Sequence, residues 1–485
     1  MDCLNSPIVV GALLSLCLFI LLRYRDEPIY SLPPCAPGKV PILGHLLQFA
    51  KPMGVQELFR QWSLMVGPVF SLHLGRKRWI VLNSIDAVQD LIVKRGTIYS
   101  SRDLPDVLVN DFMHGAHAGL VKKKIDNYAP ILDERRRALV AGMFKASDNV
   151  SGKAIELRKL IEHYTMTLIL TIAFGNICSF EPGDPQLHEV FEVTEQAASI
   201  FGPEQQLCEF FPILTPLFNK REAFLEMKRR HVNFYNQLYD QFCRQSDPEE
   251  CFVKDVAEKK ELTDMQITDL IAVFVGAGSD TTASTLQWMI ALLANRPEIQ
   301  DRAYSEIIEQ VGVDRLPNQE DECKLTYLQC ILYETLRLRP PAPLSVPHAT
   351  SEDDMYQGWF IPAKTTVIIN LHAIHQDPER YPNPQEFLPE RHIDYVNLKL
   401  DEANLSLRDR PHLSFSAGRR GCVGIHLAER SLYMAASSLL ACFRFETDGW
   451  LDDISAKDIR APTYSPMPHK VRVVPRRNDI EKLFS

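Results

Sequence analysis

Residues 415–424 read FSAGRRGCVG, and this stretch decides how the rest of the chain is interpreted. Glycines stand four residues before and two residues after Cys422, and Arg420 stands two residues before it. A tight hairpin uses such glycines because they adopt positive φ and let the backbone approach closely. Backbone N–H groups and a positive charge beside a sulfur favour the thiolate. The stretch predicts a loop that presents Cys422 as a metal ligand, against the alternative of an inert packed thiol.

The pattern F-x-x-G-x-R-x-C-x-G closely resembles the haem-ligating loop of the cytochrome P450 family, the haem-thiolate monooxygenases. The resemblance implies that Cys422 is the axial ligand of the iron of haem b and that Gly424 belongs to the same haem-binding loop. It also implies that Phe415 packs beside the sulfur and that Arg420 pairs with a haem propionate. A thiolate ligand favours O–O cleavage, and hydrogen bonds to the sulfur moderate its electron donation.

A long helix is predicted between residues 262 and 295, where Thr263 or Asp264 provides an N-cap. The middle of this helix reads AGSDTT at residues 277–282. Glycine weakens a helix, and consecutive hydroxyl residues bond backward to carbonyls. The composition therefore allows a locally opened helix.

The same stretch resembles the oxygen-activation motif of the family. The resemblance implies that Asp280 and Thr281 form an acid–alcohol pair that delivers protons during oxygen activation, directly or through water. It also implies that Ala277 and Gly278 leave room above the haem. The alternative is that Gly276 and Gly278 only permit close helix packing.

Glu334 and Arg337 form an E-x-x-R pair, whose spacing puts both side chains on one helical face. Such pairs are frequent on surfaces, but residues 387–392 follow with the sequence FLPERH. In the family these pieces meet, which implies a structural network of Glu334, Arg337 and Arg391 around the haem loop. The family's P-E-R-F ends here in His392, a departure with no evident catalytic cost.

Two further haem contacts are implied by resemblance. Residues 128–137 align with a helix that usually carries W-x-x-x-R for the haem propionates, and Arg136 fits the arginine. Leu132 occupies the tryptophan position, so the hydrogen bond of the indole ring is missing. His348 lies where a basic residue often meets the second propionate, and its alternative is a surface histidine.

Hydrophobic spacing predicts a mainly α fold with small β-sheets. Helical spacing dominates after residue 84, as in residues 155–174, 224–244 and 297–311. Alternation predicts a hairpin at 69–82, and β-branched residues predict strands within 357–370. Strands and helices do not alternate, and no G-x-G-x-x-G precedes a helix, which disfavours a Rossmann fold. The resemblance implies the P450 fold, a triangular helical domain that encloses haem.

Composition limits the classes of partner. The 485 residues carry a net charge of −9, which argues against nucleic acid as a partner. The eleven cysteines contain no C-x-x-C pair, so a zinc ribbon and covalent haem attachment are excluded. Free thiols fit a reducing compartment.

Residues 7–22 form an uncharged apolar run followed by Arg23 and Arg25. The run predicts an N-terminal membrane segment, slightly short for a full span of about 20 residues. A cleaved signal peptide is the alternative, but its positive charge precedes the apolar run, whereas Asp2 stands there. The arginines after the run leave the body of the protein in the cytosol.

The chain is therefore divided into a membrane anchor at 1–25, a proline-rich hinge at 26–44 and a catalytic domain at 45–485. Proline makes the hinge a stiff, extended spacer. The resemblance to microsomal members of the family implies a place in the endoplasmic reticulum membrane. The overall style resembles fungal members that act in secondary metabolism.

The partners follow from the same resemblance. Basic residues at 122–124 and 135–137, with Arg419, form a candidate patch on the cysteine side of the haem, against the alternative of ordinary solvated charge. Such a patch would steer an acidic electron donor. The expected donors are an NADPH-cytochrome P450 reductase in the same membrane and cytochrome b5.

The substrate is expected to be a lipophilic small molecule such as a terpenoid or polyketide, oxidised with O2. The family's substrate contacts fall on mostly apolar residues here, which suit such a ligand. They include Leu108, Phe112, Phe201, Phe274, Leu344 and Val346, with residues 464–467. Two alternatives remain open: a haem-thiolate isomerase or dehydratase that needs no reductase, and an inactive membrane-tethered haem- or ligand-binding protein.

Overall fold

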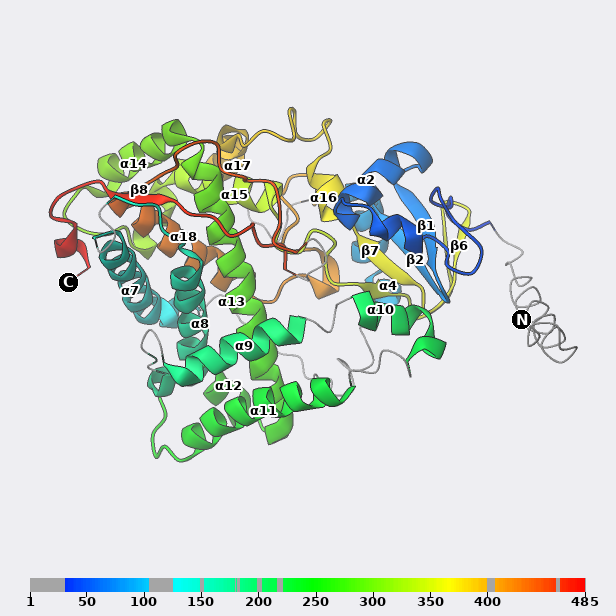
Figure 1. Ribbon diagram of the computed structural model, residues 1–485, viewed down its shortest axis with the longest axis horizontal. Helices are drawn as coiled ribbons and strands as arrows, with labels where there is room; N and C mark the ends of the chain where they lie inside the picture. The colour runs from blue at the N-terminus through cyan, green and yellow to red at the C-terminus, as the bar shows by residue number, and fades with distance from the viewer. Residues whose placement is uncertain are drawn as a thin grey trace, which may run out of the picture.

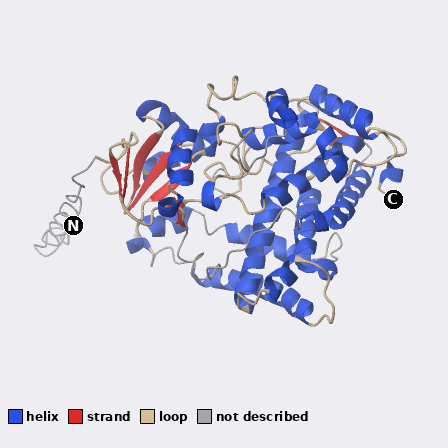
Figure 2. Ribbon diagram, turned by 180° about the vertical axis from the view of Figure 1, so that it is seen from behind, coloured by secondary structure: helices blue, strands red, loops and turns tan. Residues whose placement is uncertain are grey.

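The computed structural model describes residues 31–103, 125–148, 152–178, 180, 184–198, 203–215, 221–398, 406–458 and 463–484. Helices occupy most of the molecule, and the largest sheet lies at one side of it (Figures 1 and 2). The prediction of a mainly α fold with small β-sheets is confirmed. The apolar run at 7–22 and the basic residues at 122–124 lie outside the described residues.

Helices of very different length make up the larger part of the fold. The α-helices are α2 (Val55–Val66), α3 (Ile85–Ala87), α4 (Gly96–Tyr99), α7 (Ala129–Asp148), α8 (Arg158–Phe174), α9 (Pro185–Ala198), α10 (Pro203–Phe210), α11 (Arg221–Cys243), α12 (Phe252–Glu258), α13 (Asp264–Ala294), α14 (Pro297–Val311), α15 (Thr326–Leu338), α16 (Leu371–His375), α17 (Ile393–Leu398) and α18 (Ile425–Cys442). Further short helices include the π-helix η3 (Val88–Lys94) and the 3-10 helices η8 (Pro212–Leu214), η10 (Pro389–His392) and η12 (Gly418–Arg420).

The strands form one five-stranded sheet and two strand pairs. They are β1 (Val69–Leu74), β2 (Lys77–Leu82), β3 (Ser101–Arg102), β4 (His348–Ala349), β5 (Asp354–Tyr356), β6 (Trp359–Ile361), β7 (Thr366–Ile369), β8 (Phe443–Glu446) and β9 (Arg472–Pro475). The large sheet has the order β1-β2-β7-β4-β3, in which only the β2–β7 pairing is parallel. The hairpin predicted at 69–82 is therefore confirmed, and the sheet brings residue 102 beside residue 348.

The long predicted helix is present as α13, which crosses the helical part of the molecule (Figure 1). Thr263 caps it, and the side chain of Gln266 bonds back to the backbone of Thr263. Its 31 residues span about 46 Å. α13 packs against α8. This contact supports the helix whose middle holds the candidate catalytic residues.

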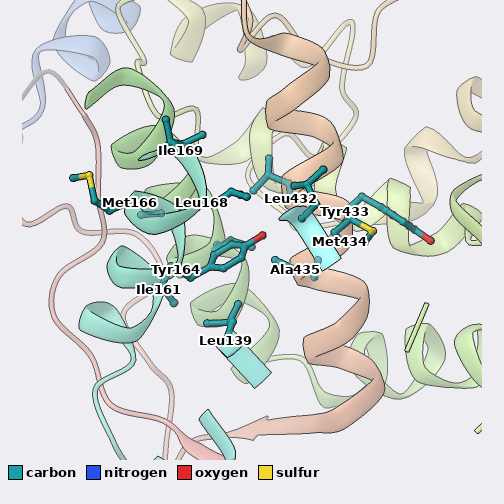
Figure 3. Close-up of a cluster of buried hydrophobic side chains, with 14 of the residues drawn as sticks. Leu139, Ile161, Tyr164, Met166, Leu168, Ile169, Leu432, Tyr433, Met434 and Ala435 are labelled. Carbon is teal, nitrogen blue, oxygen red and sulfur yellow. The ribbon is translucent and has the colours of Figure 1, made fainter. Parts of the chain in front are cut away.

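The main hydrophobic core lies where α7, α8 and α18 meet (Figure 3). Tyr164 of α8 is buried there, and its hydroxyl donates to the carbonyl of Ser431 on α18 over 3.3 Å. Within the described residues, the stretch Arg158–Cys178 is long and apolar enough to cross a membrane, but 72% of its most apolar window is buried in the protein. α8 is accordingly a core helix.

Part of the predicted hinge belongs to the folded domain. Residues 34–36 lie along β1, where the N–H of Ser71 donates to Pro34 over 2.7 Å and the N–H of Ala36 donates to Ser71 over 2.9 Å. An edge strand offers such unpaired backbone groups to any neighbouring extended segment. The sheet therefore holds residues 34–36 of the predicted hinge, and the division of the chain at residue 44 stays a prediction.

Candidate functional site

The loop of Cys422 is a compact turn between η12 and α18. The N–H of Cys422 donates to the carbonyl of Phe415 over 2.8 Å. Gly418 has a φ of +68°, and a Cβ at this position would lie 2.6 Å from the carbonyl oxygen of Ile92. Gly424 is the N-cap of α18, so the positive end of the helix dipole lies next to the cysteine. The loop thus has the geometry that its glycine spacing predicts.

The sulfur of Cys422 has an open side but is otherwise surrounded by protein. The residue is exposed in the polypeptide, yet burial of the sulfur by its neighbours raises the pKa of the thiol. The backbone N–H of Gly424 opposes this effect, since it bonds to the sulfur and lowers the thiol pKa. A metal cation on the open side would hold this sulfur as a thiolate at neutral pH.

The described residues contain no group of three or more His, Cys, Asp or Glu side chains that could hold a metal ion. In this part of the chain, Cys422 therefore offers a single protein ligand. A single thiolate fits a metal that brings its remaining ligands in a macrocycle, as haem does.

A basic cluster of Arg102, His348 and Arg420 lies beside the cysteine loop. Arg102 and His348 are direct neighbours on β3 and β4, and the backbone carbonyl of Arg420 accepts from Arg102 over 3.5 Å. Arg420 in turn donates from Nε to the carbonyl of Ser100 over 2.9 Å. Burial, together with the charge of Arg420, lowers the pKa of Arg102 to about 10. Among the described residues, neither arginine has an acidic partner.

His348 supplies an unused polar atom in this cluster. It is buried, so the alternative of a surface histidine is wrong. Its Nδ1 donates to the carbonyl of Tyr99 over 2.7 Å, whereas its Nε2 is buried and has no hydrogen-bond partner in the described structure. Burial, together with the charges of Arg102 and Arg420, lowers the pKa of His348 to about 4. An anionic ligand such as a haem propionate would neutralise the two arginines and favour a proton on Nε2 of His348, which could then donate to the ligand.

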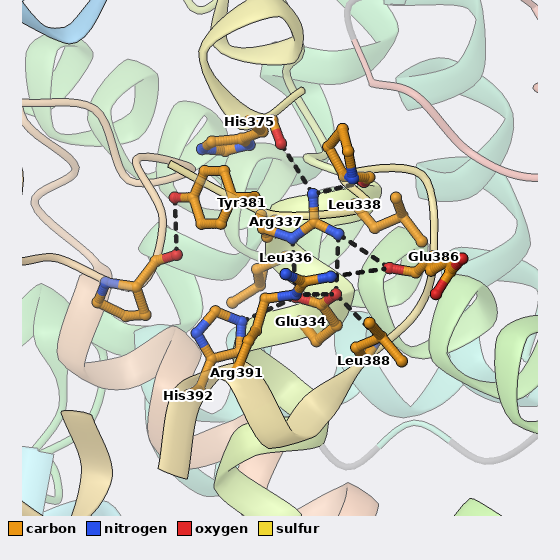
Figure 4. Close-up of polar contacts among 12 residues, drawn as sticks. Glu334, Leu336, Arg337, Leu338, His375, Tyr381, Glu386, Leu388, Arg391 and His392 are labelled. Carbon is orange, nitrogen blue, oxygen red and sulfur yellow. Dashed lines mark hydrogen bonds and ion pairs between the residues drawn. The ribbon is translucent and has the colours of Figure 1, made fainter. Parts of the chain in front are cut away.

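The network of Glu334, Arg337 and Arg391 is present and buried (Figure 4). Arg337 contacts Glu334 twice, at 2.7 and 2.8 Å, and Arg391 donates from Nε to Glu334 over 2.9 Å. His392, which sequence analysis left without a role, bonds to the same carboxylate over 2.8 Å. Burial alone would raise the pKa of Glu334, but hydrogen bonds from Arg337 and His392 lower it to about 2. Arg337 also donates to the carbonyl of His375, which links the network to α16.

The middle of α13 remains α-helical throughout, so the local opening that its composition allows is absent. The hydroxyls do bond backward, as expected: Thr281 donates to the carbonyl of Ala277 over 2.7 Å. Ala277 and Asp280 are exposed and Thr281 is partly exposed, and the i, i+3, i+4 spacing places all three on one face. This face can accept a substrate or a proton-carrying water.

Gly278 lies on another side of α13. A Cβ at Gly278 would lie 3.2 Å from Cδ1 of Ile169 on α8, whereas a Cβ at Gly276 would meet nothing within 4 Å. Close helix packing therefore explains Gly278 but not Gly276. The open space that sequence analysis assigned to Ala277 and Gly278 is found at Ala277 alone of these two.

Arg136 does not lie at the cysteine loop. Its guanidinium is buried and donates to the carbonyl of Pro317 over 2.7 Å and to the hydroxyl of Ser438 over 2.8 Å, and it pairs with Asp133. Ser438 lies fourteen residues after Gly424 in the sequence, about 20 Å along α18. The predicted propionate contact of Arg136 is therefore wrong, because this arginine ties α7 to the far end of α18.

Comparison with known proteins agrees with this arrangement. A model of the cytochrome P450 family matches residues 33–123 and 107–457. The chain belongs to the cytochrome P450 family. Cytochrome P450 monooxygenase 231 of Postia placenta is 32% identical over 503 aligned residues, which cover 92% of this chain and 88% of the relative. Cytochrome P450 monooxygenase fogE of Aspergillus ruber is 31% identical over 493 aligned residues, which cover 92% and 87%. The protein is a P450 monooxygenase, a haem-binding oxidoreductase with the mainly helical P450 fold.

Only some of the predicted substrate-contact residues lie in the part of this P450 that the structure describes, and these occupy separate positions. Leu108, Phe112 and Phe201 lie outside the described residues. Phe274 stacks on Phe252 of α12, with ring centroids 4.6 Å apart, and Leu344 packs against the core beneath β1. Val346 is exposed, and Tyr464 is held by α13, where Trp288 donates to its carbonyl over 2.7 Å.

Only part of the predicted basic patch is found near the cysteine loop. Arg136 is internal, and Arg137 bonds to Asp133 and to the carbonyl of Leu483. Arg419 is exposed and lies against Gly96, on the side of the cysteine loop. Of the patch residues that the structure describes, Arg419 is the one placed to meet an electron donor near this loop.

Sequence analysis missed Arg102 and the role of His392. Arg102 gave no local signal because its neighbours His348 and Arg420 are hundreds of residues away in the chain. His392 was visible as a departure from the family pattern, and its position directly after Arg391 was the available sign of a contact with the carboxylate.

Proposed function

We propose that this P450 oxidises a lipophilic small molecule, a secondary metabolite such as a terpenoid or polyketide, by haem-thiolate monooxygenation with Cys422 as the axial ligand. The observation that carries the proposal is the open sulfur of Cys422 beside the basic cluster of Arg102, His348 and Arg420, whose arginines have no acidic partner among the described residues. When bound, the haem supplies an iron that binds and activates O2. Arg102, Arg420 and His348 would hold its propionates.

Two backbone groups of the loop would support the thiolate of Cys422. The N–H of Gly424 stabilises the anion of Cys422, and the carbonyl of Phe415 fixes the cysteine backbone. Behind the loop, the network of Glu334 keeps α15 and η10 together, so that the loop is supported by a rigid element.

Asp280 and Thr281 would move protons to the reacting oxygen. Thr281 donates its hydroxyl proton to Ala277 in the resting structure, and a rotation about χ1 frees it to face a ligand. Asp280 is exposed on the same face and can take protons from water. These two side chains favour reduction of O2 over rearrangement of a peroxide.

Electrons would come from an NADPH-cytochrome P450 reductase, with cytochrome b5 as a second donor. The exposed Arg419 offers positive charge on the side of the cysteine loop, and attraction of an acidic donor raises the rate of association. Arg419→Glu should slow reduction of the haem at low salt and lose this effect at high salt.

The membrane anchor and the cellular location are proposed from the sequence. Residues 1–25 would anchor the enzyme in the endoplasmic reticulum membrane, and the catalytic domain would lie in the cytosol. Removal of residues 1–25 should release the protein from the membrane fraction and leave its spectrum unchanged. Retention in the membrane fraction at high salt would contradict a single anchor.

The decisive experiment is the difference spectrum of the reduced, carbon-monoxide-bound protein, with Cys422→Ser in parallel. A thiolate-ligated haem gives a band at about 450 nm in the parent protein and none in the variant. A folded parent protein that binds haem without this band would overturn the assignment. Ligands that displace water from the iron can then be tested for turnover with reductase.

Thr281→Ala and Thr281→Ser separate monooxygenation from isomerisation. With a turned-over substrate, loss of the hydroxyl should divert NADPH consumption to hydrogen peroxide and lower product formation about 100-fold, while serine retains most of it. Product formation that continues without NADPH in both variants would instead identify an isomerase or dehydratase.

A further inference from the structure

Two buried histidines hold the chain directly before the cysteine loop. His375 ends α16, and its Nε2 accepts a hydrogen bond from the N–H of Leu413 over 2.8 Å. The Nδ1 of His412 accepts from the N–H of Ser414 over 3.2 Å. Two consecutive backbone amides are thus satisfied by two imidazoles, just before Phe415.

The hydrogen bonds decide the protonation state of both rings. A ring nitrogen that accepts a hydrogen bond carries no proton, so each ring is neutral. The proton of His375 then lies on Nδ1 and that of His412 on Nε2. These two nitrogens are buried and have no hydrogen-bond partner in the described structure. Each ring therefore keeps a buried N–H group without a partner, which is unfavourable. Such a cost is consistent with a need for the other ring nitrogen as a hydrogen-bond acceptor.

The surroundings of the rings also favour the neutral forms. The rings of His375 and His412 are 6.4 Å apart at 85°, and aromatic rings pack around them: Tyr381 beside His375, and Phe415 and Tyr333 beside His412. Burial is the main cause that lowers the pKa of both histidines.

Most charged neighbours also lower the pKa of the two histidines. His375 faces Arg337, Arg380 and His412, which lower its pKa, and His412 faces His392, Arg380 and Arg410, which do the same. The carboxylate of Glu334 and the carbonyl contact of His375 with Arg337 oppose them.

Hydrogen bonds and short stretches of backbone together connect the Glu334 network to the cysteine. Arg337 donates to the carbonyl of His375 over 2.8 Å (Figure 4), and the ring of His375 holds Leu413. The carbonyl of Phe415, two residues further on, accepts from the N–H of Cys422 over 2.8 Å. The two amides that the histidines hold are thus joined through Phe415 to the backbone of Cys422.

We propose that His375 and His412 are positioning residues for Cys422, which act as neutral acceptors for the amides of Leu413 and Ser414. The proposal rests on the proposed haem-thiolate function. Protonation of either ring would place an N–H group against a backbone N–H group, and the approach to the loop would be released.

The first test compares variants with and without an acceptor. His375→Gln and His412→Asn each offer an amide oxygen near the position of the accepting nitrogen, whereas His375→Phe and His412→Phe keep a ring without an acceptor. In the carbon-monoxide spectrum, the phenylalanine variants should lower the ratio of the band at about 450 nm to the blue-shifted band of haem without thiolate by about tenfold. The amide variants should stay within about twofold of the parent protein.

Hydrogen exchange gives a readout that is independent of haem spectra. The peptide that contains Leu413 and Ser414 should exchange faster in the phenylalanine variants and at the parent rate in the amide variants. Four variants with the parent spectrum and the parent exchange rate would overturn the proposal. An equal loss in the amide and phenylalanine variants would also overturn it, since ring shape and not the acceptor would then matter.

Acid titration keeps the proposal testable if the phenylalanine variants do not fold. The parent protein should lose its band at about 450 nm as the pH falls, and the double variant His375→Gln, His412→Asn should lose it about one pH unit lower. An unchanged midpoint would overturn the proposal. A parent protein that never shows the band contradicts the proposed function, whereas a normal parent with unresponsive variants contradicts this inference alone.

Discussion

The imidazole of His392 donates to the carboxylate of Glu334, with 2.8 Å between Nε2 and Oε2. This carboxylate also binds two arginines and the N–H of Leu388, so that it is fully occupied by donors inside the protein (Figure 4). A buried carboxylate is tolerated only when it is paired in this way. The residue after Arg391 is thus part of the network.

His392→Phe should lower the free energy of unfolding by about 1–2 kcal/mol, because one oxygen of Glu334 loses a buried hydrogen bond while Arg337 remains. Denaturant unfolding measures the change. The exposed His188→Phe is the matched control and should have almost no effect. Equal stability of the two variants would contradict a role of His392 in the network.

Glu334→Gln should be more damaging, with a loss of about 3–5 kcal/mol, because the guanidinium of Arg337 is left buried without its counter-charge. Haem content and unfolding should both report the loss. Glu309→Gln changes an exposed glutamate of α14 in the same way and serves as the control. If both glutamine variants resemble the parent protein, the network does not support the loop.

Gly418→Ala and Gly276→Ala should have opposite effects on stability. At Gly418 the added Cβ meets the carbonyl oxygen of Ile92 at a φ of +68°, so the cysteine loop cannot close and haem retention should be lost. At Gly276 the Cβ meets nothing within 4 Å, and alanine should stabilise α13 by up to about 1 kcal/mol. Thermal unfolding of both variants checks the pair, and a haem-replete, stable Gly418→Ala protein would contradict the strained turn.

Stability should fall in two steps as the pH decreases. The pKa values of His375 and His412 lie below the ordinary 6.5, so the unfolded chain binds more protons below about pH 6.5 and the folded state loses stability. Each ring contributes a slope of up to about 1.4 kcal/mol per pH unit. Glu334, whose pKa is lowered from 4.5 to about 2, adds a second loss as the pH falls from about 4.5 toward 2.

Denaturant unfolding at a series of pH values measures these steps. The double variant His375→Gln, His412→Asn should reduce the slope of the first step, to which His348 also contributes, and leave the second step unchanged. An identical first step in the variant would show that other histidines cause it.

Much of the site is predictable because it is local. The turn of Cys422 needs glycine at positions set by the backbone, and α13 carries its cap and its central hydroxyls within one helix. Glu334 and Arg337 share a helical face by spacing alone. In each case, chemistry and geometry are encoded within a few consecutive residues.

Arg136 shows where such reasoning fails. Its spacing on a basic helix suited a haem contact, but α7 packs against the far end of α18, and Ser438 and Pro317 take up the guanidinium. Gly278 fails in the same way, because its packing against Ile169 depends on α8 and not on its own helix.

The sequence by itself therefore determined the family, the cysteine, the long helix and the E-x-x-R pair, since these depend on local spacing. Only the tertiary structure decided that Arg102 and His348 meet Arg420, that His392 joins Glu334, and that two neutral histidines hold the cysteine loop. These contacts join segments distant in the chain. Their partners are selected by how sheets and helices pack, and no periodicity within either segment records that choice.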